Sequence, residues 1–400
     1  MQNCRMSDVF RRSLGWLFVS LPVLFGCTEP FEPPVDERQT DILVVEGIVN
    51  ASDSTALVKL SRARPLSQVD TSYAEPGAAV SIHSSAGDIF TLKEETVGNY
   101  VAYSLPIDKS VTYRLNITTA NGTDYVSDTV SIKSTPPIDS LSFGVTNDNM
   151  GLSIRLTTHD DSGQSRYYAW SYTETYEYHA AFNSGYKFID GVPIIRTPEE
   201  RIDKCWRSIS STDVLIGTSQ NLTKDIISEQ ELNIIPKYSP KISVRYSILI
   251  EQRVLSSQEF EYLSLLKKTT EGQGTLFDGS PGPVVGNIHQ ANDYKAVVLG
   301  YFGGSEIIRE RHFLTFNELP EVLREPPSKD GCQLSFTCDN TQPRFTNFIP
   351  PCFFLEDLSS KSAIIGVFSG GTNPTSYTFT KAQCADCRLQ GGITTPPDFW

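Results

Sequence analysis

Six cysteines are the residues of this 400-residue chain whose side chains are most clearly able to do chemistry. They are Cys205, Cys332, Cys338, Cys352, Cys384 and Cys387. Cys384-Ala-Asp-Cys387 has the spacing of half a zinc site or of a redox pair. A structural zinc site needs four ligands, however, and the sequence has no second Cys-x-x-Cys. A redox pair of this spacing normally opens a helix after a βαβ strand, and no such pattern is present. An even number of cysteines in an exported chain favours disulfides, with the pairing left open.

Histidines and carboxylates show no catalytic pattern. The histidines lack ligand-like spacing, and the sequence contains no His-Glu-x-x-His, Gly-x-Ser-x-Gly, Walker loop or Gly-x-Gly-x-x-Gly. His159-Asp160-Asp161-Ser162-Gly163 is either a calcium loop, because calcium prefers oxygen ligands, or a polar hairpin turn, because turns select Asp, Ser and Gly. We favour the turn. We therefore predict no catalytic residue, no metal and no cofactor.

One segment places aromatic rings at every second position. Tyr168, Trp170, Tyr172, Tyr176 and Tyr178 alternate with other residues, which predicts a long strand with one aromatic face. A sheet buries such a face against its partner layer, so core is the first interpretation. The face is also a candidate binding face, because aromatic rings anchor protein interfaces and stack on sugar rings. A protein interface and a glycan platform are the second and third interpretations.

The elements that position these residues are predicted to be mainly strands. Between residues 41 and 134, seven short apolar runs are separated by turn signals, which predicts an immunoglobulin-like β-sandwich. Asn121-Gly122, between the runs 112–118 and 125–132, marks a hairpin. After the linker Thr135-Pro136-Pro137, residues 138–400 are predicted to form a larger β-rich domain with a disulfide-rich C-terminal region.

Within this second domain we predict strands at 168–178, 242–251, 294–302 and 312–316, and one helix. Ser256-Ser257-Gln258-Glu259 has the spacing of a capping box, and Gly272 lies beyond the helix end. Phe260, Leu263 and Leu266 share one face of this helix. That face is more typical of a core than of a partner surface.

Cys27 follows a segment with the pattern of a secretion signal. Three arginines lie within residues 1–12, the stretch 14–26 is largely apolar, and it is too short for a comfortable spanning helix. A cysteine directly after such a stretch resembles the lipobox of bacterial lipoproteins, whose cysteine is acylated. We therefore expect residues 1–26 to be a signal peptide and Cys27 to carry the lipid. Residues 27–40 are acidic and rich in proline, which predicts an extended tether.

The charge of the chain is consistent with this expectation. The formal net charge is -13 at pH 7, which favours solubility and excludes nucleic acid as an expected partner. Several acyl chains on Cys27 would hold a soluble domain at a bilayer almost permanently.

Four stretches resemble the lipoprotein family of Bacteroidetes known as domain of unknown function 4249. They are Leu43-Val44-Val45-Glu46-Gly47, the pair Gly274-Thr275-Leu276-Phe277-Asp278 and Gly286-Asn287-Ile288, Leu299-Gly300-Tyr301-Phe302 before Arg311, and the C-terminal run from Cys384 to Gly392 with Pro397-Asp398-Phe399-Trp400. The resemblance implies an outer-membrane, surface-facing lipoprotein that accompanies a TonB-dependent transporter. The resemblance implies no catalytic residue in this sequence.

Together, these features predict a non-enzymatic lipoprotein of the outer membrane that binds a TonB-dependent transporter. The expected partners are the bilayer, through acylated Cys27, the transporter, and a glycan or other small ligand. A surface glycan-binding lipoprotein is the first alternative. An unrecognised hydrolase with paired carboxylates is the second.

Overall fold

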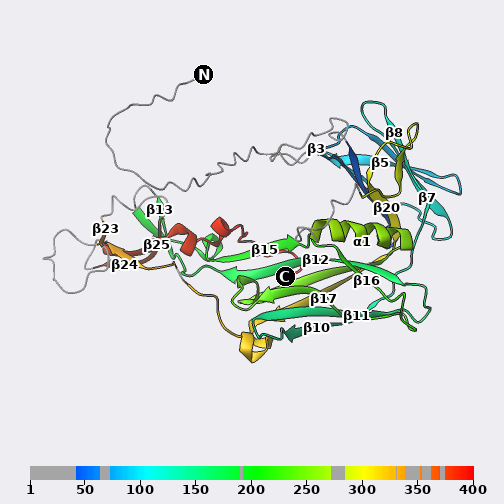
Figure 1. The fold of residues 1–400 in the computed structure, drawn as a ribbon. Coiled ribbons are helices and arrows are strands. Elements are labelled where there is room, and N and C mark those ends of the chain that lie inside the picture. The colour runs from blue at the N-terminus through cyan, green and yellow to red at the C-terminus, as the bar shows by residue number, and fades with distance from the viewer. Residues whose placement is uncertain are drawn as a thin grey trace, which may run out of the picture. The chain divides into compact units, whose positions relative to one another are not determined.

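The computed structural model describes residues 42–63, 73–189, 192–271, 284–329, 331–337, 352–353, 362–369 and 374–400 (Figure 1). Residues Asp41–Trp400 form one compact unit, separate from Met1–Thr40. The expected signal peptide, Cys27 and the tether lie outside the described residues. The architecture is mainly β, as the sequence predicted.

The N-terminal strands form the predicted sandwich. They are β1 (Leu43–Asn50), β2 (Thr55–Arg62), β3 (Tyr73–Ala74), β4 (Ala79–Ser84), β5 (Ile89–Thr96), β6 (Asn99–Ala102), β7 (Thr112–Thr118), β8 (Asp124–Ser127) and β9 (Val130–Ser131). Alternate residues of these strands point inward, and they include Val45, Leu60, Ile82 and Leu115, each at most 1% exposed. The Asn121-Gly122 hairpin is confirmed, because β7 and β8 pair antiparallel and Gly122 has φ +83°.

Two strands from far along the chain complete this sandwich. β20 (Leu299–Ser305) pairs parallel with β1, and β19 (Ile288–Gln290) pairs antiparallel with β8. The strand order is β19-β8-β7-β4-β5-β6-β2-β1-β20, with β3 and β9 attached beside it. Phe302 of β20 is fully buried in the core of the sandwich. The sandwich thus includes segments that lie beyond residues 41–134.

The second core lies between two further sheets. One has the order β15-β12-β18-β21, with β16 beside β12, and the other has the order β10-β11-β17. Their bounds are β10 (Ile138–Val145), β11 (Gly151–His159), β12 (Tyr167–His179), β15 (Lys204–Ser210), β16 (Leu215–Thr218), β17 (Ile226–Pro236), β18 (Arg245–Val254) and β21 (Ile307–Thr315). Leu152, Ile154 and Leu156 of β11 pack with alternate residues of β12 and β18. Sequence patterning located three of these strands, since the predicted 168–178, 242–251 and 312–316 overlap β12, β18 and β21. The predicted strand 294–302 was misplaced, because only its last residues form a strand, β20, and this strand pairs with β1 of the sandwich.

The aromatic face of β12 faces this core. Tyr168, Trp170, Tyr172, Tyr176 and Tyr178 are all buried, none more than 8% exposed. The candidate binding face is therefore corrected to core. The period-two pattern correctly predicted a strand with one aromatic face. That face is buried between two sheets, where a sheet places its largest apolar side chains.

The predicted helix is α1 (Ser257–Glu271). Ser256 precedes it, and its Oγ accepts a hydrogen bond from the Glu259 amide at 3.1 Å, as the capping pattern predicted. The expected end at Gly272 lies outside the described residues. Figure 1 shows α1 beside β12 and β20.

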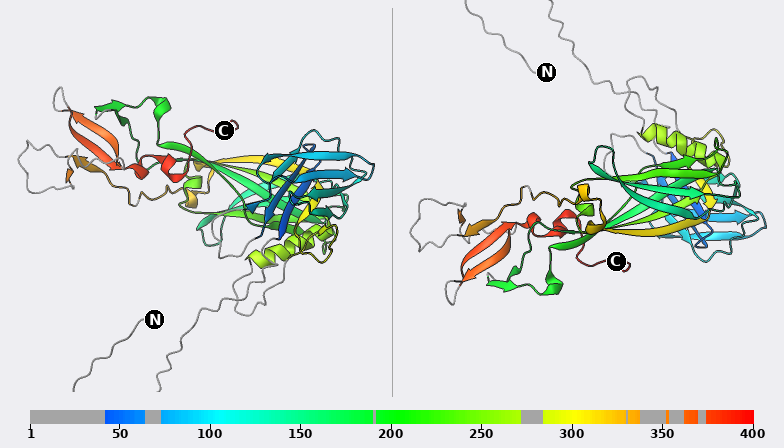
Figure 2. Two further views of the ribbon diagram at one scale, coloured as in Figure 1. Left: turned by 90° about the horizontal axis from the view of Figure 1, so that it is seen from above. Right: turned by 90° about the horizontal axis from the view of Figure 1, so that it is seen from below.

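Two small sheets complete the described structure. β22 (Ser335–Thr337), β23 (Cys352–Phe353), β24 (Ser362–Ser369) and β25 (Pro374–Lys381) form one, in which the orange pair β24–β25 is antiparallel (Figure 2). β13 (Tyr186–Ile189) and β14 (Val192–Ile195) form the other. Short 3-10 turns occupy Pro198–Glu200, Pro240–Ile242, Phe316–Glu318, Glu321–Leu323, Ala382–Cys384 and Cys387–Gln390.

Two disulfides connect distant parts of the chain, and one of them joins the C-terminal residues to β15. Cys205 bonds Cys387, and Cys332 bonds Cys384. The expectation of disulfides is thus confirmed for four of the six cysteines. In particular, Cys384 and Cys387 do not pair with each other, because each has a partner elsewhere. Cys338 lies outside the described residues.

Candidate functional site

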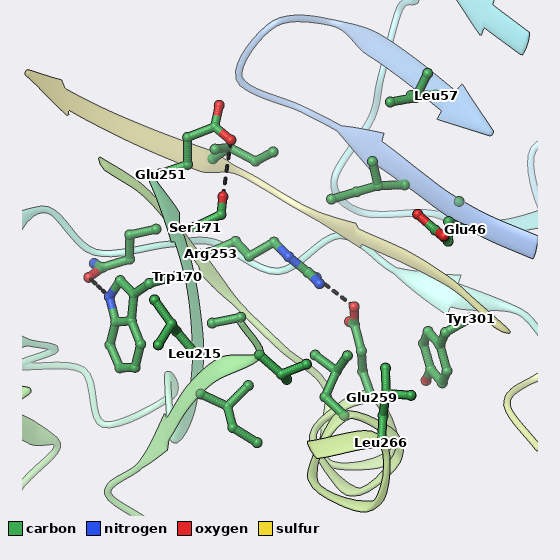
Figure 3. A pocket seen from close by; sticks show the side chains of 18 of the residues that line it. Glu46, Leu57, Trp170, Ser171, Leu215, Glu251, Arg253, Glu259, Leu266 and Tyr301 are labelled. Carbon is green, nitrogen blue, oxygen red and sulfur yellow. Dashed lines mark hydrogen bonds and ion pairs between the residues drawn. The ribbon is translucent and has the colours of Figure 1, made fainter. Parts of the chain in front are cut away.

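A cleft lies between the sandwich, helix α1 and the end of the β12–β18 sheet (Figure 3). Its volume is about 500 Å³, which is within the range of small-molecule sites. The apolar part of its lining includes Ile48, Leu57, Leu215, Ile216, Leu263 and Leu266. The charged part comprises Glu46, Lys59, Asp213, Glu251, Arg253 and Glu259.

Helix α1 is held at the cleft by an ion pair. Glu259, in the first turn of α1, is 6% exposed, and its Oε1 lies 2.5 Å from Nη1 of Arg253 on β18. A carboxylate in the first turn also interacts favourably with the helix dipole. Gly303 of β20 leaves room for it, because a Cβ there would lie 2.9 Å from both carboxylate oxygens. The Leu266 side chain, seen in Figure 3, and that of Leu263 consequently line the cleft.

Trp170 forms part of the floor of the cleft. Its Nε1 donates to Oε1 of Gln252 at 2.8 Å. Gln252 is fully buried, and its Nε2 donates to the Pro136 carbonyl at 2.9 Å and to Thr158 Oγ1 at 3.0 Å. Because the indole N–H and both polar atoms of the Gln252 amide have partners, the ring is fixed, and the floor is preorganised.

The rim carboxylate of Glu251 is fixed from two strands. Ser171 Oγ of β12 donates to its Oε2 at 3.2 Å (Figure 3). Arg309 Nε of β21 donates to its Oε1 at 2.6 Å. Arg309 also pairs with Asp53, in the turn between β1 and β2. Arg253 thus neutralises Glu259, and Arg309 neutralises Glu251. Both carboxylates therefore stabilise the fold through these ion pairs.

Tyr301 of β20 supplies a neutral polar group to the cleft. Burial is the largest cause that raises the pKa of its phenol, and the hydroxyl lies 3.3 Å from Ser256 Oγ. The hydroxyl stays protonated at neutral pH and can donate or accept a hydrogen bond. An apolar lining with a few fixed polar groups is suited to binding and orienting a ligand.

The other candidate from the sequence, residues 159–163, is a turn. Asp160 Oδ1 accepts from the Ser162 amide at 2.9 Å, and its Oδ2 accepts from Ser162 Oγ at 2.8 Å. His159 Nδ1 lies 2.7 Å from Asp139 Oδ2, and hydrogen bonding to Asp139 raises the pKa of the imidazole. Among the described residues, no three His, Cys, Asp or Glu side chains are grouped to hold a metal ion. The preferred interpretation as a turn is confirmed.

Sequence reasoning missed the cleft, because its lining comes from residues between 46 and 307. Of the five aromatic candidates, only Trp170 reaches it. The available signal was the helix face, since Leu263 and Leu266 were assigned to one face and that face does border the cleft. Glu251, at the end of the predicted strand 242–251, was a second signal, because it also lines the cleft.

A comparison with family models decides the relationship of this chain to known proteins. Residues 28–311 match the model described as "Domain of unknown function (DUF4249)". The chain belongs to the DUF4249 family. The expected family membership is thereby confirmed, and the matched range contains the sandwich, α1 and every residue that lines the cleft.

Two further comparisons concern the same DUF4249 chain. No curated protein matches it. Among solved structures, it is similar to a two-domain fibronectin type-III segment of chicken tenascin, with 15% identity, a TM-score of 0.14, and coverage of 52% of this chain and 88% of that chain. In the part of the chain that the structure describes, no helix is long and apolar enough to cross a membrane.

Proposed function

We propose that this DUF4249 chain is a lipid-anchored, non-enzymatic binding protein of the outer membrane, facing the cell exterior and working with a TonB-dependent transporter. The lipid anchor is Cys27, which directly follows the signal-like stretch 14–26. The acidic, proline-rich residues 27–40 then act as a spacer between the bilayer and the folded unit. The transporter is proposed as the partner on the basis of the family resemblance.

The observation that carries the binding role is the cleft beside α1. Its volume of about 500 Å³ suits a small ligand, and its lining combines leucine and isoleucine side chains with fixed polar groups. Of the four carboxylates in the lining, Glu251 and Glu259 are held in ion pairs with arginines, and Glu46 lies 3.8 Å from Lys59. This arrangement favours capture of a ligand over acid–base chemistry, for which a carboxylate must be available to the substrate.

The first experiment tests the partner. The tagged full-length protein is purified from its own outer membrane in mild detergent, and co-purifying proteins are identified by mass spectrometry. A TonB-dependent transporter in near-equal amount supports the accessory role. Recovery of the protein alone contradicts stable docking. Cys27→Ser tests the anchor in the same strain, because the variant is expected to leave the membrane fraction.

The second experiment tests the cleft with two neighbouring leucines of α1. Leu266 lines the cleft, whereas Leu265 is 43% exposed and lies outside its lining. Small molecules released from the purified protein are compared for wild type, L266R and L265R. We expect a molecule that is retained by wild type and L265R but lost from L266R. Equal retention by both variants would show that the cleft is not the binding site.

A further inference from the structure

The second, outward face of the β12–β18 sheet has a composition of its own. Among the β12 residues that alternate with the buried aromatics, Thr173 and Thr175 carry hydroxyl groups and pair across to serines of β15. Thr173 Oγ1 lies 3.1 Å from Ser210 Oγ, and Thr175 Oγ1 lies 2.8 Å from Ser208 Oγ. Ser208 and Ser210 are exposed. Thr175 is only 1% exposed. We call the three accessible residues, Thr173, Ser208 and Ser210, the hydroxyl row.

Two arginines lie on the same face beside the hydroxyl row. Strand register places Leu249 opposite both Thr173 and Arg311, and it places Arg245 opposite Glu177, which is next to Thr175 along that face. The Arg311 guanidinium lies 3.5 Å from the centre of the Phe399 ring and donates to Ser247 Oγ at 3.0 Å. Both arginines therefore belong to one surface together with the hydroxyl row.

Aromatic rings, and not carboxylates, hold these two arginines. The Arg245 guanidinium lies 4.5 Å from the Phe313 ring centre and 5.0 Å from that of Trp400. Within the described residues, neither Arg245 nor Arg311 makes an ion pair with a carboxylate, whereas Arg309 of the same strand pairs with Glu251 and Asp53. Glu318 is near enough for Arg245 to contribute to lowering its pKa, but its main contacts are with Thr315.

Two carboxylates of this face are already engaged. Glu177 interacts with Lys204 and His179 and accepts from Trp400 Nε1 at 3.3 Å, and Glu251 is held by Arg309. A stacked arginine keeps its edge N–H donors available, and these donors match a carboxylate in fork geometry. Phe313 and Phe399, at 37% and 41% exposed, add apolar ring surface. Among the described residues, Arg245 and Arg311 thus offer two guanidinium groups outside ion pairs on this face, with exposed Asp398 beside Phe399 as a further carboxylate.

We propose that this face binds a carboxylate-bearing sugar, as found in a uronic-acid polysaccharide. The arginines would bind the sugar carboxylate, the hydroxyl row would hydrogen-bond its hydroxyls, and the exposed rings would pack on its C–H surface. The glycan platform considered from the sequence was placed on the Tyr168–Tyr178 face, which is core. The opposite face of the same strand carries the suitable groups. This inference does not depend on membrane anchoring or on the cleft.

The test is titration calorimetry of the full-length protein in mild detergent with oligogalacturonate and with a neutral dextran oligomer of the same length. Oligogalacturonate should bind, with affinity that falls as salt rises, and the dextran should bind at least tenfold more weakly. R311Q and R245Q should each lower the affinity about tenfold, which corresponds to about 1.4 kcal/mol. R114Q removes one positive charge from exposed Arg114 of the sandwich and should have no effect.

Two substitutions at exposed Ser210 make the test independent of folding. S210K should strengthen oligogalacturonate binding and S210E should weaken it, while both variants keep the wild-type melting temperature. Absence of heat with oligogalacturonate, equal binding of dextran, or equal effects of R114Q and R311Q would each overturn the proposal. None of these results bears on co-purification of a transporter, so the two proposals fail separately.

Discussion

The side chain of Asn287 hydrogen-bonds both backbone groups of Phe302. Its Nδ2 donates to the Phe302 carbonyl oxygen at 2.8 Å, and its Oδ1 accepts from the Phe302 amide at 2.9 Å. Asn287 is 5% exposed and Phe302 is fully buried. The Asn287 side-chain amide thus makes the two hydrogen bonds that a neighbouring strand would make to Phe302 of β20. These bonds attach the segment after α1 to the sandwich.

We expect Asn287→Ala to destabilise the protein by about 2–4 kcal/mol, because two buried backbone groups lose their partners. Urea unfolding followed by circular dichroism measures this free energy. Asn317→Ala, at an exposed position, is the control and should change stability by less than about 0.5 kcal/mol. Equal midpoints for the two variants would contradict the role assigned to Asn287.

Gly300 permits the close approach of β20 to β1. Its φ is +108°, and a Cβ there would lie 1.8 Å from the Val45 carbonyl oxygen. Gly300→Ala should therefore cost about 3 kcal/mol or more, since it combines backbone strain with a clash against main chain. Gly144→Ala is the control, because a Cβ at that position would have no neighbouring atom within 4 Å. A G300A melting temperature equal to that of G144A would refute this account.

The two disulfides should differ in their contribution to stability. Cys205–Cys387 closes a sequence separation of 182 residues and Cys332–Cys384 one of 52. In the chain-entropy model, these loops correspond to about 5 and about 4 kcal/mol. We expect the double variant C205A/C387A to unfold at lower denaturant concentration than C332A/C384A. The reverse order, measured under the same conditions, would show that loop entropy does not dominate.

Glu177 makes stability depend on acid pH. Burial raises the pKa of its carboxyl, but hydrogen bonds from Lys204 and His179 outweigh burial, so the net shift is downward. A lowered folded-state pKa stabilises the protein above the unfolded value of about 4.3, and this contribution is lost as pH falls through the folded-state value. Melting temperatures between pH 6 and pH 3 should fall less steeply for Glu177→Gln than for wild type. Parallel curves would exclude this contribution.

Local patterns in the sequence determined much of the fold. The alternation in Tyr168–Tyr178 located β12, the Ser256–Glu259 spacing located the start of α1, and Asn121-Gly122 located the β7–β8 hairpin. Each of these signals acts over a few residues, because side-chain direction, capping and turn geometry are set by near neighbours. The predicted run 125–132 is divided in the structure into β8 and β9.

Only the tertiary structure decided how distant segments meet. The parallel pairing of β1 with β20, the two disulfide partners and the cleft lined from residue 46 to residue 307 all join positions that no local pattern relates. The same holds for the two faces of β12. Period two in the sequence showed that the faces differ, but the packing of β10-β11-β17 against one of them decided that the aromatic face is core.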